Sequence, residues 1–404
     1  MTRPTGCRPI FAPLLAIAAA TSMLAPAAQA APPQQALQRV LDEWAHDPKR
    51  SAGPGVAVAI SKMNAEGELE GQPLVLVSGV RDAGLKNPLQ PGDAFILGSC
   101  TKSLTAVLIA HLVDERKLEW TSTLGELGDR LNLKVHPGFR KVTINDILVH
   151  RAGIPEEWHP PHANREQTVI ALLARGPDST LGEDHYSDNG FSVLGYLAEK
   201  IFNAADGRGR TWDHLVEEEI YAKLGIVEQA GASFQRGAFA GRSVKRWEEI
   251  AKTGPVAHKG MVPERGLDDS FELPSLAPAA AAQLPMGEWL KFVRFLQNGS
   301  AGKPAHNGII SDPSVFAHLF ELPGKDRAGR KGYLYYGALT GSPSDYNYVG
   351  VNGGFTAFFS FQKPSASGGL AITIASNSYY SWSMGALSKL HQDLYAAWKA
   401  ASPN

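Results

Sequence analysis

Three serines in this sequence are each followed three positions later by a lysine, a spacing that can place a hydroxyl nucleophile beside a proton acceptor. Such a pair can attack a carbonyl carbon, because the lysine amine takes the serine proton while the serine oxygen forms an acyl intermediate. Residues at positions i and i+3 share a face of a helix, whereas side chains alternate between the two faces of a strand. The three pairs are Ser99 with Lys102, Ser300 with Lys303, and Ser360 with Lys363.

The local sequence selects the first pair. Ser300 lies in a glycine-rich loop and Ser360 in a strand pattern, so neither is predicted to face its lysine. Ser99 opens a segment with apolar residues at helical spacing, so Lys102 is predicted to lie one turn along the same helix. Backbone N–H groups at a helix start favour negative charge, which makes the Ser99 N–H a predicted oxyanion donor. Lysine has an ordinary pKa of about 10.4, so Lys102 needs a partly desolvated site to act as a base. From this pair alone, a capping serine beside a surface lysine is an equally good interpretation.

The elements that must position this pair are predicted at both ends of the chain. The predicted strands cover residues 55–62, 72–80, 356–362 and 369–376, and a closing helix covers 384–398. We expect an α/β (α+β) fold in which an antiparallel sheet from both termini is flanked by helices, with a mostly helical region inserted between its halves. Residues 31–125 and 331–404 are assigned to the α/β part and residues 126–330 to the helical part, with the active site at their junction.

Composition restricts the partners. The chain has 404 residues, of which 44% are hydrophobic, so it can bury a sizeable core. Its 39 basic and 40 acidic residues nearly balance, and no polybasic run offers counterions to phosphate. We therefore expect a small-molecule or short-peptide substrate, without nucleic acid or an anionic membrane as partner.

The N-terminus has the pattern of a secretory signal. Arg3 and Arg8 precede an apolar run that ends at the small-x-small sequence Ala28-Gln29-Ala30. Cleavage after Ala30 would leave residues 31–404 as a single domain with no stable membrane anchor, in the periplasm or outside the cell. The mature chain would keep one cysteine, Cys100, which is predicted to be a small buried filler.

Several segments around the first pair carry a family resemblance. FILGSCTKSLTAVLIAHLVDE, HPGFRKVTINDILVHRAGIP, HYSDNGFSVLGYLAEKIF, NGGFTAFFSF and GLAITIASN follow one another along the chain. They resemble, in family order, the serine β-lactamase and penicillin-binding-protein superfamily, particularly its class C β-lactamase, D-alanyl-D-alanine carboxypeptidase and esterase branch. The resemblance implies a β-lactamase/transpeptidase-like fold.

The second motif of this superfamily, Tyr-x-Asn, falls on Tyr186-Ser187-Asp188. The resemblance implies that Tyr186 lies near Ser99 and shares its proton transfer with Lys102. Asp188 departs from the family asparagine. An ionised carboxylate only accepts hydrogen bonds, so Asp188 would contact a substrate amide carbonyl poorly and is a candidate to pair with Lys102 instead.

The third motif, Lys or His followed by x-Gly, falls on Val351-Asn352-Gly353 or, one position on, on Asn352-Gly353-Gly354. Neither register has a cation to receive a substrate carboxylate, which favours a neutral ester, amide or lactone. The resemblance implies that the N–H of Gly354 completes the oxyanion hole. His258-Lys-Gly and His306-Asn-Gly match the motif literally but do not lead into the terminal strand pair.

Other candidate sites are weaker. His159 and His162, near several carboxylates, fit a metal site less well than a loop bordering the cleft, where Trp158 and His159 would touch substrate. His150 is interpreted as a structural histidine. We expect no metal and no organic cofactor.

The sequence therefore predicts an exported serine hydrolase that acts through a Ser99 acyl-enzyme on an ester, amide or lactam carbonyl. Esterase and D-amino-acid peptidase or amidase activities both fit this prediction. The alternative is a catalytically degenerate penicillin-binding-like protein that binds cell-wall peptide or a partner, which the departures at Asp188 and Val351 motivate. The presence of Ser99, Lys102 and Tyr186 together favours the enzyme.

Overall fold

The structure is a computed structural model, and it describes the following residues: 32–46, 55–80, 88–156, 158, 160, 164–227, 275–303, 308–320, 348–353, 357–362, 368–376 and 383–402. The predicted signal segment at residues 1–30 lies outside this described part. Among the described helices, none combines the length and the apolar character that crossing a membrane requires.

A five-stranded antiparallel sheet is built from both ends of the chain, as the sequence predicts. Its strands are β1 (Gly55–Met63), β2 (Leu69–Gly79), β5 (Tyr348–Gly353), β6 (Ala357–Gln362) and β7 (Gly369–Ser376), in the order β2-β1-β7-β6-β5. The two terminal segments meet at the centre of the sheet, where Val56 of β1 lies opposite Ser376 of β7. This pairing joins strands that are more than 300 residues apart in sequence, so the sheet forms only when both ends come together.

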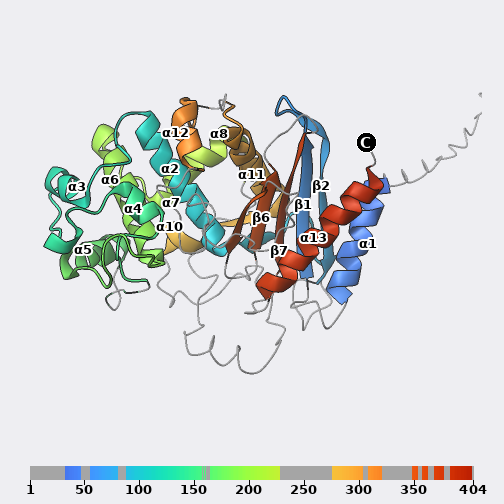
Figure 1. Cartoon of the computed structure of the whole chain (residues 1–404), viewed down its shortest axis with the longest axis horizontal. Helices are drawn as coiled ribbons and strands as arrows, with labels where there is room; N and C mark the ends of the chain where they lie inside the picture. Colours follow the sequence, from blue (N-terminus) through green and yellow to red (C-terminus); the bar gives the residue numbers. More distant parts are fainter. Residues whose placement is uncertain are drawn as a thin grey trace, which may run out of the picture.

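Helices cover both faces of the sheet (Figure 1). Helices α1 (Pro32–His46) and α13 (Ser383–Ala401) lie side by side on one face, and α11 (Met286–Ser300) lies on the other. Side chains alternate along a strand, so Val56 and Val58 pack toward α1 and α13, whereas Ala57 and Ala59 belong to the core on the α11 side. The sheet is thus the middle of three layers.

Helix α11 lies within the range that the sequence analysis assigned to the helical part, but it packs on the sheet. Its buried residues include Trp289 and Phe292, and the Trp289 ring meets Phe359 of β6 edge-on at 5.7 Å. The Nε2 of Gln297 donates to the carbonyl of Gln362, also in β6, at 2.9 Å. The helix therefore belongs with the α/β part.

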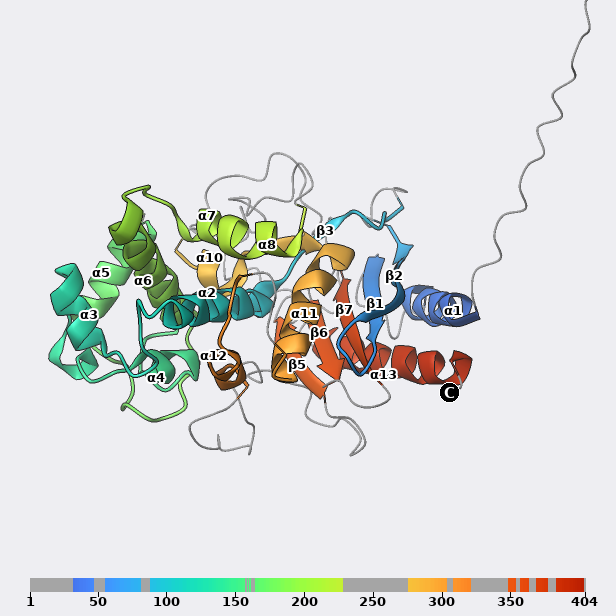
Figure 2. The same ribbon diagram turned by 90° about the horizontal axis from the view of Figure 1, so that it is seen from above.

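The remaining helices form a second part beside the sheet (Figure 2). They are α3 (Leu124–Leu131), α4 (Ile144–Leu148), α5 (Arg165–Arg175), α6 (Asp188–Asp206), α7 (Trp212–Val216), α8 (Ala222–Leu224), α10 (Ala277–Ala280) and α12 (Pro313–His318). Short connecting elements are β3 (Ala94–Ile96), β4 (Gln283–Pro285) and the 3₁₀ turn η2 (Pro137–Phe139). Helix α2 (Lys102–Asp114) runs from the sheet into this part, and eleven consecutive residues from Lys102 to Leu112 are buried.

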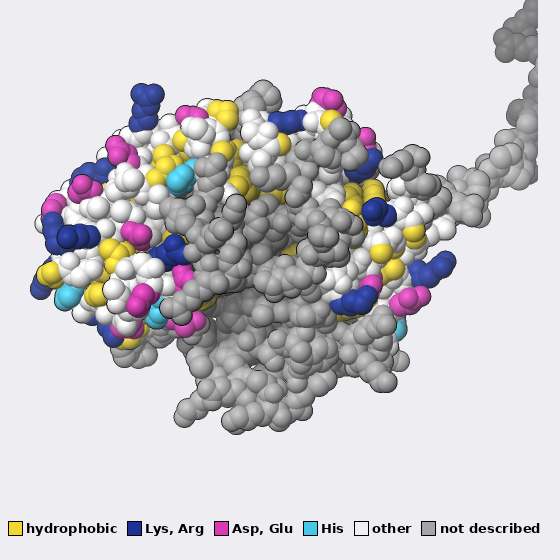
Figure 3. All heavy atoms as spheres, viewed as in Figure 1, with side chains coloured by type: hydrophobic (Ala, Val, Ile, Leu, Met, Phe, Trp, Pro, Cys, Tyr) yellow, Lys and Arg dark blue, Asp and Glu magenta, His cyan; other side chains and the backbone are white. Residues whose placement is uncertain are grey.

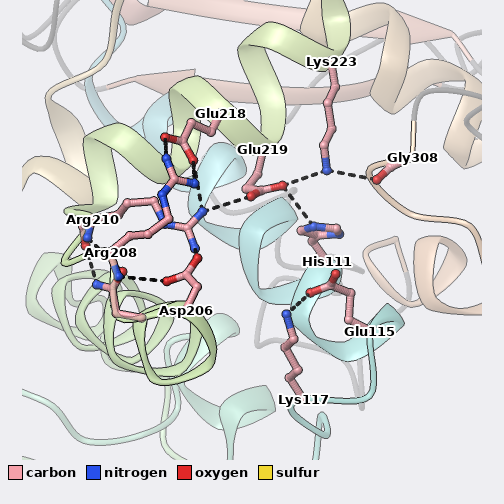
Figure 4. A network of polar contacts seen from close by, with 11 residues as sticks. His111, Glu115, Lys117, Asp206, Arg208, Arg210, Glu218, Glu219, Lys223 and Gly308 are labelled. Carbon is pink, nitrogen blue, oxygen red and sulfur yellow. Dashed lines mark hydrogen bonds and ion pairs between the residues drawn. The ribbon is translucent and has the colours of Figure 1, made fainter.

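An ion network fixes the far end of α2 (Figure 4). A π-helical turn, Glu217–Tyr221, presents Glu219 to His111 of α2 at 3.4 Å and to Lys223 at 2.7 Å. Arg210 bonds both Glu218 and Glu219. On the face seen in Figure 3, the described surface carries charges of both signs interspersed, as expected from the near-zero net charge.

Candidate active site

Ser99 lies where a 3₁₀ turn, η1 (Gly98–Thr101), leads into α2. Gly98 has φ of 51°, a conformation that side chains with a Cβ disfavour, and the Leu97 N–H bonds the carbonyl of Ala282 at 2.8 Å. Cys100 is fully buried, as predicted, whereas Ser99 is partly exposed. Since Ser99 is in the first turn, its N–H has no acceptor within the helix and is available to a ligand.

Lys102 lies one turn beyond Ser99, donates hydrogen bonds to two oxygens and forms an ion pair with a carboxylate. Its Nζ is 3.0 Å from Ser99 Oγ, 3.1 Å from the carbonyl of Ala279 in α10, and 2.6 Å from Asp188 Oδ1. An ammonium group carries a positive charge and only donates, so two donated hydrogen bonds and an ion pair match its protonated form. Lys102 is 8% exposed.

The charge of Asp188 decides the protonation of Lys102. Burial lowers the pKa of Lys102, but the Asp188 carboxylate, with a smaller effect of Tyr186, outweighs burial and raises the pKa above its ordinary value. From the sequence, Lys102 is expected to need a desolvated site that lowers its pKa and frees its lone pair. In the structure the ion pair has the opposite effect, and the free protein holds Lys102 as an ammonium ion.

Tyr186 completes the contact with the nucleophile. Its hydroxyl lies 2.6 Å from Ser99 Oγ, and either oxygen can be the donor. Burial, as the largest cause, raises the pKa of the phenol, so Tyr186 is protonated at neutral pH. Lys102 Nζ lies 4.9 Å from the centre of its ring.

The first turn of α6 sets the position of Asp188. Ser187 caps this helix, because its Oγ accepts the N–H of Gly190 at 2.9 Å and donates to the carbonyl of Pro155 at 2.8 Å. Asp188 is the first helical residue and is 9% exposed. The structure thus places Asp188 on Lys102, the alternative that the sequence analysis left open.

His150 is buried and hydrogen-bonded, in keeping with its interpretation as a structural histidine, and it lies beside the site. Its carbonyl accepts the N–H of His185 at 2.8 Å, and its Nδ1 accepts the N–H of Ser187 at 3.0 Å. The imidazole lies 4.5 Å from the Tyr186 ring, centre to centre. Burial, aided by the charge of Lys102, holds the pKa of His150 well below its usual range, so the ring is neutral. A signal for this role in the sequence is absent, because residues 150 and 186 meet only through tertiary folding.

The third-motif residues are described only in part. Asn352 and Gly353 form the end of β5, opposite Phe358 and Ala357 of β6. The Cys100 thiol lies 3.8 Å from the carbonyl of Ala357, so this end of the strand pair borders the turn that carries Ser99. Gly354, the predicted second oxyanion donor, lies outside the described residues.

Trp158, which the sequence predicts to border the cleft, contacts the first turn of α6. Asn189 Nδ2 donates to the carbonyl of Trp158 at 2.7 Å, and the Asn189 N–H bonds the carbonyl of Glu156 at 3.2 Å. His159 and His162 lie outside the described residues. Within the part of the chain that is described, no group of three or more His, Cys, Asp or Glu side chains is arranged to hold a metal.

The fold is shared with known proteins. The Beta-lactamase family profile matches residues 38–396, and the chain belongs to the Beta-lactamase family. The superfamily expected from the sequence and its mixed helix and antiparallel-sheet fold are therefore confirmed. The chain has the fold of a Beta-lactamase-family serine hydrolase.

Individual relatives are distant. "Unguisins hydrolase ungD'" of Aspergillus campestris (strain IBT 28561) is 26% identical over 235 residues, which are 54% of this chain and 41% of the relative. The chain spans less than half the length of the curated relatives that head the comparison. The solved structure of "EstCE1, a hydrolase with promiscuous acyltransferase activity" has a TM-score of 0.63 at 15% identity, covering 90% of this chain and 99% of that one. A class C β-lactamase from Rhodobacter sphaeroides has a TM-score of 0.60 at 14% identity, covering 90% and 98%.

Proposed function

We propose that this protein hydrolyses neutral esters or amides through an acyl-enzyme on Ser99. The observation that carries the proposal is the double contact on the nucleophile, in which Ser99 Oγ lies within hydrogen-bond distance of both Lys102 Nζ and Tyr186 OH. Two proton-carrying groups on one serine hydroxyl are what acyl transfer requires, because a proton must leave the serine on attack and reach the leaving group on collapse.

The proposed steps follow from these contacts. Ser99 attacks the carbonyl carbon, and the Ser99 N–H, with the predicted N–H of Gly354, stabilises the resulting oxyanion. Tyr186, protonated and 2.6 Å from Oγ, supplies a proton path toward the leaving group. Water then releases the acyl group by the reverse proton movements.

The neutral character of the substrate rests on charge. The superfamily that the sequence resembles has a cation where this chain has Val351 or Asn352, and an amide where this chain has the carboxylate of Asp188. A substrate carboxylate would find no lysine or histidine at this motif, and the charge of Lys102 is already neutralised by Asp188. The signal pattern of residues 1–30 supports action in the periplasm or outside the cell.

A paired assay tests the proposal. The purified protein is given a short-chain nitrophenyl ester and, separately, a chromogenic cephalosporin, and Ser99→Ala is compared with Ser300→Ala. The second variant removes the serine of another Ser-x-x-Lys pair, whose hydroxyl only caps the end of α11 on the carbonyl of Gln297. We expect ester turnover that Ser99→Ala abolishes and Ser300→Ala preserves. If the folded protein turns over neither substrate, the result would favour the degenerate binding protein. Cephalosporin turnover would contradict the proposal that the substrate is neutral.

A further inference from the structure

The proton of Ser99 has no simple destination in this site. Lys102 is held as an ammonium ion by its ion pair with Asp188 and by two hydrogen-bond acceptors, and its pKa is raised. Tyr186 is a neutral phenol with a raised pKa. A fully protonated amine cannot take up a further proton unless it first releases one.

One oxygen is placed to receive the released proton. Asp188 Oδ1 lies 2.6 Å from Lys102 Nζ, on the same nitrogen that contacts Ser99 Oγ at 3.0 Å. The other acceptor on Nζ, the carbonyl of Ala279, is not basic enough to keep a proton. The path Oγ to Nζ to Oδ1 therefore consists of two short contacts that meet at one atom.

We propose that Asp188 is the final acceptor of the Ser99 proton, with Lys102 relaying it. Lys102 first gives one proton to Oδ1, and the neutral amine then turns its lone pair toward Oγ and takes up the Ser99 proton as the Oγ–carbon bond forms. Lys102 is then an ammonium ion again, Asp188 is neutral, and the negative charge has passed to the oxyanion. When the intermediate collapses, the leaving group takes a proton from Lys102 or through Tyr186, and Asp188 returns its proton to Lys102. This inference rests on the proposed function, since it assigns the proton path of the same acyl transfer.

The surroundings of the pair favour this exchange. Both side chains are nearly buried, with exposed fractions of 9% and 12%, so bulk water does not compete for the proton. Among the described residues, the other ionisable groups near the pair are Tyr186, beside Asp188, and His150, behind the tyrosine ring, with His185 acting on His150. His150 is kept neutral and adds no second cation that would hold Asp188 in its ionised form.

The relay makes a prediction for the unmodified protein. The assay is the pre-steady-state burst of nitrophenol from p-nitrophenyl acetate, measured from about pH 6 to pH 10. Because the relay works with Lys102 protonated, the burst rate constant should be level over about pH 7 to 9. A rate that instead rises about tenfold per pH unit throughout this range would show that Lys102 must first lose its proton, and would overturn the relay.

The matched variants are Asp188→Asn and Asp129→Asn. The first removes the acceptor with little change of shape and leaves the burial of Lys102 uncompensated, so the pKa of Lys102 falls and its free amine becomes the base. We expect a burst rate about 10²-fold lower near pH 7 that climbs with pH toward the unmodified rate. The second makes the same change in an exposed pair with Arg140 and should leave rate and profile unchanged. An Asp188→Asn rate within about threefold of the unmodified rate, with the same level profile, would overturn the proposal.

The acyl-enzyme on Ser99 and the relay to Asp188 are overturned by different results. A burst that depends on Ser99 but not on Asp188 leaves the proposed function standing and removes the relay. The absence of any burst, and of any Ser99 adduct with a fluorophosphonate probe, in the unmodified protein at every pH overturns both.

Discussion

Replacing His150 should slow the reaction more than the loss of stability alone explains. Its carbonyl and Nδ1 hold the N–H groups on either side of Tyr186, at His185 and Ser187, and its ring lies against the tyrosine ring. In His150→Ala the buried Ser187 N–H loses its acceptor, at a cost of about 1–3 kcal/mol, and the ring contact is worth about another 1 kcal/mol. We therefore expect a stability loss of about 2–4 kcal/mol, and a fall in kcat of about 10- to 100-fold because the Tyr186 hydroxyl is no longer held on Ser99.

His150→Asn separates the backbone contact from the ring contact. The amide oxygen of asparagine can stand in for Nδ1, and asparagine tolerates the φ of 58° found at this position. This variant should recover most of the lost stability and part of kcat, with KM little changed in both variants.

The control is His391→Asn. His391 is also buried, its Nε2 lies 2.7 Å from Ser360 Oγ, and burial lowers its pKa to about 4. It lies in α13, which is on the face of the sheet away from α11. Its replacement should lower the melting temperature and leave kcat unchanged. A His150→Ala enzyme with unaltered kcat, measured where the protein is fully folded, would refute the positioning argument.

Two further predictions concern stability. The hydrogen bond from His111 and the charge of Lys223 lower the pKa of Glu219 to about 2, so its contribution is complete above pH 4.5 and is lost as pH falls toward about 2. Glu219→Gln should lower the free energy of unfolding by on the order of 2 kcal/mol at neutral pH. In chemical unfolding at several pH values, this difference from the unmodified protein should vanish in acid. A difference in unfolding free energy that is the same at every pH would contradict the assignment. A Cβ at Gly195 would lie 2.4 Å from Pro278, so Gly195→Ala should push α10 from α6 and lower the melting temperature, together with the ester burst rate, because Ala279 anchors Lys102. Unchanged values of both would show that α10 tolerates the displacement.

Much of the fold was predictable because its signals are local. The strand 369–376 matches β7, and the helix predicted from Ser99 onward exists, with a 3₁₀ first turn. The packing of α11 on the sheet was not predictable, since its apolar face looks the same whether it covers a sheet or another helix.

The candidate site was also predictable only where its signals are local or follow from the family resemblance. The Ser99–Lys102 contact follows from helical spacing, and the tyrosine from the family resemblance. The protonation of Lys102 could not be predicted, because it depends on a balance between burial and a carboxylate 86 positions away in sequence. His150 was interpreted as structural, but its position beside Tyr186 could not be predicted, because it depends on contacts with residues 185–187 that only the folded chain creates.

The most direct test of the account is covalent labelling of the nucleophile. The purified protein is treated with a fluorophosphonate probe, digested, and analysed by mass spectrometry, beside Ser99→Ala and Ser300→Ala. The account predicts a single adduct on the peptide that contains Ser99, which persists in Ser300→Ala and is lost in folded Ser99→Ala. An unlabelled Ser99 in active protein, or an adduct that survives Ser99→Ala, would contradict the claim that Ser99 carries the acyl group.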